Sequence, residues 1–165
     1  MLRGLAEGVG VGEVATHRRP IVEWHAAHAK GGAVACGGAL ADNAAMAFEI
    51  SITRQFAAAH QLRLDDGRLE ELHGHNWKVR VTVGAPRLDP GGVVMDFHEL
   101  ERRVDAVIGR LHNRHLNDLP AFARTNPSAE NVAAHVAEAV VLPAGVELCS
   151  VEVWETETCR AVFRP

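Results

Sequence analysis

Residues 77–83 read WKVRVTV, so large apolar side chains alternate with polar ones. The tryptophan and the three valines would point to one face of a strand, and the lysine, arginine and threonine to the other. Residues 46–53, MAFEISIT, alternate in a similar way, and a polar connection around Asp65-Asp66-Gly67 separates the two segments. Together they predict two half-buried strands joined by a long hairpin connection.

Two helices are predicted after this hairpin. Asp96 and Glu99 have the spacing of a capping box, and apolar residues recur at spacings of three and four from Phe97 to Leu111. A second helix should start near residues 126–128, because the proline of Asn-Pro-Ser suits a first turn. Valines spaced one turn apart would form its buried stripe.

Residues 148–156 and 160–164 are rich in Val, Phe and Trp and predict two closing strands. The resulting order, ββααββ, is typical of an α+β fold with an antiparallel four-stranded sheet and two helices on one face. A single helical layer leaves the other face of the sheet uncovered. We therefore expect oligomerisation to cover it.

Residues 1–45 differ from the rest of the chain, because they are crowded with Gly and Ala and show no sustained period. Such a segment buries little apolar surface, so it is predicted to be disordered. Alternatively, Met46 is the translation start and the extension is an artefact of the gene model. Residues 46–165 are expected to form one folded domain.

The composition argues against several classes of protein. The formal net charge of -4 gives no electrostatic reason to expect a nucleic-acid partner. No apolar stretch approaches roughly 20 residues, and no basic segment precedes an apolar one at the N-terminus, so neither a membrane span nor a secretory signal is predicted. Cys36, Cys149 and Cys159 match no zinc ribbon or disulfide framework, which is typical of free thiols in a reducing cytoplasm.

Three histidines form the strongest chemical signal. His73 and His75 flank Gly74, and residues two apart on a strand point to the same side. His60 lies at the end of the first strand, where the hairpin would bring it near this pair. Three His ligands leave one tetrahedral position free, as in a catalytic zinc site. The alternative interpretation of His-Gly-His is a surface pair with no metal.

Several motifs, taken in order, resemble those of the 6-pyruvoyltetrahydropterin synthase and 6-carboxytetrahydropterin synthase family over residues 46–165. They are FAAAH at 56–60, HGHN at 73–76, VMDF at 94–97, LHNRHLN at 111–117, NPSAEN at 126–131 and VWET at 153–156. This resemblance implies the tunnelling fold (T-fold), a homohexamer and a pterin substrate, 7,8-dihydroneopterin triphosphate.

The same resemblance assigns roles to individual residues. It implies that the three histidines bind Zn2+ and that Glu155 anchors the pterin, because two carboxylate oxygens match two adjacent N–H donors. Glu130 would be a second polar residue of the pterin pocket. The alternatives are a surface strand residue for Glu155 and, for Glu130, a carboxylate that complements the helix dipole.

The chain departs from the family at its proton-transfer residues. Leu69 stands where the family has Cys, and Glu70 beside it resembles a branch in which a Glu-x-x-His-Gly-His arrangement replaces that Cys. His112-Asn113 stands where the family has Asp-His. We therefore expect Glu70 and His112 to carry the proton chemistry, with His115 as a weaker candidate.

The function implied by the resemblance is a zinc-dependent, cytoplasmic lyase like 6-carboxytetrahydropterin synthase, acting in queuosine or pterin biosynthesis. Two alternatives remain open. Glu70 favours the branch that forms 6-hydroxymethyl-dihydropterin for folate synthesis. Loss of the Cys and the paired His would instead fit a zinc- and pterin-binding protein without turnover.

Overall fold

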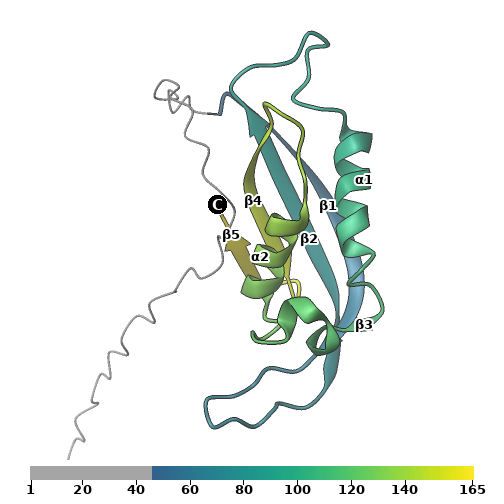
Figure 1. The fold of residues 1–165 in the computed structure, drawn as a ribbon, viewed down its shortest axis with the longest axis vertical. Coiled ribbons are helices and arrows are strands. Elements are labelled where there is room, and N and C mark those ends of the chain that lie inside the picture. The colour runs from purple at the N-terminus through teal and green to yellow at the C-terminus, as the bar shows by residue number, and fades with distance from the viewer. Residues whose placement is uncertain (1–45) are drawn as a thin grey trace, which may run out of the picture. The chain divides into compact units, whose positions relative to one another are not determined.

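The computed structural model describes residues 46–165 (Figure 1). The predicted extension, residues 1–45, lies outside the described residues. The main elements are β1 (Phe48–His60), β2 (His73–Ala85), α1 (Phe97–Ile108), β3 (Arg114–His115), η1 (Leu116–Asp118), η2 (Pro120–Phe122), α2 (Ala129–Ala139), β4 (Glu147–Trp154) and β5 (Arg160–Phe163). No helix in this part of the chain has the length and apolar character needed to cross a membrane.

The sheet has five strands in the order β3-β1-β2-β4-β5. The four predicted strands are present and pair antiparallel, but β3 adds a parallel pair with β1, so the expected four-stranded antiparallel sheet is wrong in this detail. The cause is a turn after α1. Asn113 adopts a φ of 56°, a region that Asn tolerates, and its N–H donates to the Ala57 carbonyl oxygen at 2.7 Å. As a result, the next two residues, Arg114 and His115, pair with β1.

Both helices begin close to where the sequence predicts. The Asp96 side chain caps α1 by accepting from the His98 N–H at 2.7 Å, and the Ser128 side chain caps α2. The capping box is only half formed. The Glu99 carboxylate pairs with Arg102 and Arg103 on its own helix instead of reaching back to the cap.

The core lies between the sheet and one layer of helices (Figure 1). Helix α1 contacts β1 and α2, and α2 contacts β4 and β5, so both helices cover the same face. Trp77 is fully buried there, stacks on Phe56 with ring centroids 5.9 Å apart, and donates its indole N–H to the Ala58 carbonyl oxygen. The predicted apolar face of residues 77–83 is therefore confirmed, and the opposite face carries the polar side chains.

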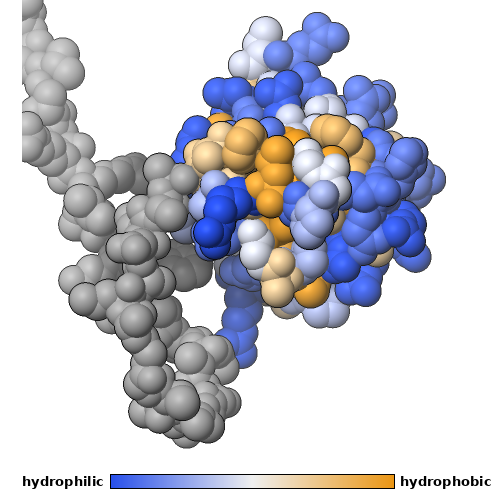
Figure 2. All heavy atoms as spheres, turned by 90° about the horizontal axis from the view of Figure 1, so that it is seen from above, coloured by the Kyte–Doolittle hydropathy of each residue, from blue (hydrophilic) through white to orange (hydrophobic). Residues whose placement is uncertain are grey.

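An apolar cavity of about 670 Å³ separates the start of β1 from the start of α1. Phe48, Leu88, Val93 and Phe97 line it and are partly exposed. Figure 2 shows the molecule from above, with apolar side chains gathered among polar ones. His60, His73 and His75 do not line this cavity.

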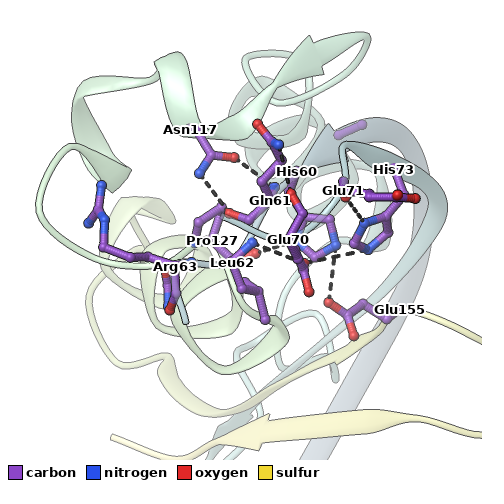
Figure 3. A network of polar contacts seen from close by, with 12 residues as sticks. His60, Gln61, Leu62, Arg63, Glu70, Glu71, His73, Asn117, Pro127 and Glu155 are labelled. Atoms are coloured by element: carbon purple, nitrogen blue, oxygen red, sulfur yellow. Dashed lines mark hydrogen bonds and ion pairs between the residues drawn. The ribbon is translucent and has the colours of Figure 1, made fainter. Parts of the chain in front are cut away.

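Two asparagines hold the chain just after β1. The Asn117 side chain accepts from the Gln61 N–H at 2.9 Å and donates to the Gln61 carbonyl oxygen at 2.8 Å (Figure 3). Asn126 does the same for Arg63, at 2.8 and 3.0 Å. Each amide thus supplies the acceptor and the donor that the backbone of a neighbouring strand would supply. We call these two side chains the asparagine clamps.

The clamps generate a prediction about stability. Replacing Asn117 by Ala removes both bonds to Gln61, and we expect the free energy of unfolding to fall by about 1–3 kcal/mol. Urea unfolding at a fixed protein concentration measures this. Asn76→Ala is the matched control, because Asn76 is exposed and makes no described side-chain hydrogen bond; its cost should stay below about 0.5 kcal/mol. Equal losses in the two variants would contradict the role given to the clamp.

Candidate metal centre and active site

The register between β1 and β2 assembles the three predicted histidines. His60 pairs directly with His73, and His75 lies two residues further along β2 on the same side. One ligand atom from each of the three rings lies within 4.8 Å of the other two. His60 is 1% exposed, whereas His73 is exposed and His75 is intermediate. The cluster therefore has one buried and one open side.

Backbone carbonyls orient two of these rings. His60 Nδ1 lies 2.8 Å from the Pro127 carbonyl oxygen, and His73 Nδ1 lies 2.8 Å from that of Glu71 (Figure 3). Because a carbonyl oxygen can only accept, each Nδ1 donates to it, which leaves Nε2 as the nitrogen available to a metal ion. His60 Nε2 is buried without a hydrogen-bond partner. Such an atom beside two more imidazoles is suited to a metal ion, and three neutral nitrogens fit zinc.

The protonation of His75 agrees with this arrangement. Burial lowers the pKa of His75, and the neighbouring His60 lowers it further, while Glu155 opposes the shift. A lowered pKa favours the neutral imidazole, which is the form that binds a metal ion.

Two carboxylates flank the histidines. Glu155 Oε1 lies 3.5 Å from His60 Nε2, and Glu70 Oε1 lies 3.8 Å from His73 Nε2. Figure 3 shows both carboxylates directed toward the histidines, one from the hairpin connection and one from the end of β4. A substrate bound at the exposed side of the histidine cluster would therefore have a carboxylate on each side of it.

Glu70 is fixed by the segment that the asparagine clamps hold. Its Oε1 accepts from the Leu62 N–H at 2.9 Å, and its carbonyl oxygen accepts from the Gln61 side chain at 2.8 Å. Leu62 lies between the two clamped residues. By contrast Leu69, at the family's Cys position, is 51% exposed. The sequence motifs contained both asparagines, but nothing in their spacing assigned them this positioning role.

Glu130 and Glu155 line a common cavity of about 280 Å³, together with the exposed residues Cys159 and Arg160. Glu130 is in the first turn of α2, and Glu155 follows the last residue of β4. The structure therefore brings together the two residues predicted to bind the pterin, although they are far apart in the sequence.

The structure places His112 differently. Its Nδ1 accepts from the Ala57 N–H at 3.2 Å, and its described contacts do not include the three histidines. Asn113 and His115 line another cavity, of about 540 Å³, that also borders His75. His115 Nδ1 lies 3.2 Å from Asp118 Oδ2, and its Nε2 is buried without a hydrogen-bond partner. The catalytic role of His112 stays a prediction.

Known proteins share both sequence and fold with this chain. The family model described as 6-pyruvoyl tetrahydropterin synthase matches residues 49–165. The chain is 36% identical to a dihydroneopterin monophosphate aldolase of Pyrococcus furiosus, over 61% of this chain and 82% of that protein. It is 39% identical to a 6-carboxy-5,6,7,8-tetrahydropterin synthase of a Synechocystis species, over 66% of this chain and 86% of that protein.

The fold is shared with the solved structure of the Caenorhabditis elegans 6-pyruvoyl tetrahydropterin synthase. The TM-score is 0.60 at 23% identity, and the match covers 72% of this chain and 95% of that one. The family match spans every element of the sheet and both helices. The chain therefore belongs to the 6-pyruvoyl tetrahydropterin synthase family and is a tetrahydropterin synthase-like lyase of pterin biosynthesis.

Proposed function

We propose that the protein is a zinc-dependent lyase that cleaves the side chain of a 7,8-dihydroneopterin phosphate, with Glu70 as the base and 6-hydroxymethyl-dihydropterin as the pterin product. One observation carries this proposal: the Glu70 carboxylate lies 3.8 Å from a histidine of the predicted zinc site, whereas the family's Cys position holds Leu69. The relative named dihydroneopterin monophosphate aldolase supports the same reaction class.

The chemistry needs one proton to leave and one to arrive. Zinc, when bound by His60, His73 and His75, would polarise the hydroxyls of the substrate side chain. Glu70 would accept the proton of the 2′-hydroxyl as the C1′–C2′ bond breaks and C2′ becomes a carbonyl. The bonding electrons pass to C1′ and into the pterin ring, and the same carboxyl group would return the proton to C1′. No oxidant or reductant is required.

Glu155 and Glu130 would bind the pterin ring, at the other end of the substrate from the bond that breaks. We infer that the Glu155 carboxylate accepts two hydrogen bonds from the pterin ring and its amino group, and that Glu130 adds a polar contact in the same cavity. Because Glu155 lies 3.5 Å from His60, this anchoring would place the pterin side chain over the histidines. Near-attack positioning of this kind contributes much of an enzyme's rate enhancement.

A second candidate is the 6-carboxytetrahydropterin synthase reaction on 7,8-dihydroneopterin triphosphate. The Synechocystis relative with that name supports it. The reaction would need a substitute for the family's Cys and His, and His112 or His115 would have to supply it. A zinc- and pterin-binding protein without turnover is the remaining alternative.

We also infer that the protein works in the cytoplasm as a homo-oligomer, a hexamer by resemblance to its family. The support is the open face of the sheet, which neither helix covers. The proposed small-molecule substrate requires no nucleic-acid or membrane partner.

Glu70→Gln tests the proposed base. The amide oxygen can still accept from the Leu62 N–H, but the side chain can no longer take up a proton, so we expect turnover to fall by about 10²–10⁴-fold with zinc content unchanged. Products from 7,8-dihydroneopterin mono- and triphosphate are identified by mass spectrometry. Glu71→Gln is the control and should keep its activity, because Glu71 contributes only a backbone oxygen to His73.

The pterin products distinguish the three candidate functions. Formation of 6-hydroxymethyl-dihydropterin with loss of activity in Glu70→Gln supports the proposal. Formation of 6-carboxytetrahydropterin by both the wild type and Glu70→Gln would overturn it in favour of the second candidate. Unchanged substrate under all conditions would identify a binding protein.

Metal content tests the histidine cluster independently of activity. We expect about one zinc per chain in the wild type, and far less after dialysis in His73→Ala, because two imidazoles alone make a weak site. His98→Ala is the control, since His98 is exposed on α1. Equal zinc content in the two variants would show that the three histidines are not the metal site.

Glu155→Gln tests the pterin anchor. Replacing the carboxylate by an amide loses a charge-assisted hydrogen bond, so pterin affinity should weaken by roughly 10–100-fold. Fluorescence titration with 7,8-dihydroneopterin measures it, with the exposed Glu157→Gln as control. If the two variants bind the pterin equally well, Glu155 is not the anchor.

A further inference from the structure

Three cations surround one tryptophan on the open face of the sheet. Lys78 Nζ lies 4.3 Å from the centroid of the Trp154 ring, Arg80 Cζ lies 5.3 Å from it, and Arg160 Cζ lies 5.6 Å from it. Lys78 and Arg160 pair with Trp154 across neighbouring strands, and Arg80 pairs with Glu152 in the next row. Directly opposed residues share a face, so these side chains form one group, which we call the basic cluster.

The basic cluster has an excess of positive charge. Its one carboxylate is Glu152, whose Oε2 lies 2.5 Å from Arg160 and whose Oε1 lies 3.6 Å from Arg80. Three cations and one anion leave two positive charges, in a chain whose formal net charge is -4. Among the described contacts, Lys78 has only the indole ring as a partner. Cation–π contacts at exposed sites offset only part of such repulsion.

The arrangement matches the chemistry of a phosphate chain. Glu152 has a 12% exposed side chain and engages one terminal nitrogen of each arginine, so both guanidinium groups are oriented and retain further N–H donors. Oriented guanidinium groups bind phosphate oxygens in pairs, and a lysine adds a point charge. A ligand with several negative charges would balance the excess of the basic cluster.

The basic cluster also borders the candidate active site. Arg160 lines the cavity that contains Glu155 and Glu130. Trp154 and Glu155 are consecutive residues, one facing the basic cluster and the other the histidines. We propose that Lys78, Arg80 and Arg160 around Trp154 form an oligophosphate-binding site on the open face of the sheet. Oligomerisation through this face, which the sequence predicts, must then leave the basic cluster in contact with solvent. If the proposed function holds, the phosphate tail of the pterin substrate is one source of this ligand, and free oligophosphate is the other.

The test uses inorganic tripolyphosphate as the probe and calorimetric titration of the zinc-free full chain, so it does not depend on turnover. We expect saturable binding that weakens as salt is added. Binding should weaken by at least about tenfold in the double variant Lys78→Gln, Arg160→Gln. The matched control is Arg87→Gln, Arg124→Gln, which removes the same charge from two exposed arginines without a described ion pair and should change affinity by less than about twofold.

Two results would overturn the proposal: no binding by the wild type, or equal weakening in both double variants. Thermal unfolding of each variant confirms that it is folded before titration. Competition experiments on the same zinc-free chain then distinguish the sources, because the proposed reaction needs zinc. If 7,8-dihydroneopterin monophosphate displaces tripolyphosphate while unphosphorylated 7,8-dihydroneopterin does not, the site takes the substrate tail. If 7,8-dihydroneopterin monophosphate and tripolyphosphate bind to the protein at the same time, the site takes free oligophosphate. Either result supports the site, and neither requires that the reaction has been identified.

Discussion

The antiparallel register between β1 and β2 is the constraint on which the candidate site depends. His60 lies opposite His73, and the two-residue repeat of a strand then brings His75 to the same side. A slip of one residue would turn both β2 histidines to the other face and would expose Trp77. Because Trp77 is fully buried against Phe56 and bonded to Ala58, the core resists that slip. Packing of the apolar face therefore fixes the geometry of the polar site.

The chain beyond β1 leaves the sheet. An isolated backbone bridge between Arg63 and Leu69 and side chains from distant segments hold it there. The asparagine clamps fix Gln61 and Arg63, and the Pro127 carbonyl oxygen fixes the ring of His60. Through the Leu62 N–H, the same segment holds the Glu70 carboxylate. The turn before α2 thus contacts His60 directly, while the segment after α1 acts on it through Gln61, the next residue of the chain. Support of this kind is what keeps metal ligands and bases in place.

Local patterns were enough to predict the strands, the helices and the histidine cluster, since a period of two and a His-Gly-His spacing depend only on residues close in sequence. The features that were missed depend on distant partners. A two-residue strand such as β3 is too short to show a period, and it forms because Asn113 turns the chain toward Ala57. Glu99 has the spacing of a capping box, but arginines on the next turn compete for its carboxylate. The basic cluster needs the register of three strands, which no single segment encodes.

The end of β4 gives the two faces of the sheet opposite charge. Glu155 turns toward the histidines, where Glu70 adds a second carboxylate, while Trp154 turns toward the cations of the open face. A pterin is recognised by acceptors for its N–H groups, whereas a phosphate is recognised by cations and donors. The separation is partial, because Glu152 lies among the cations and Arg160 also lines the cavity of Glu155. Because consecutive strand residues point to opposite faces, an acidic group and a basic group can lie close together at one strand end.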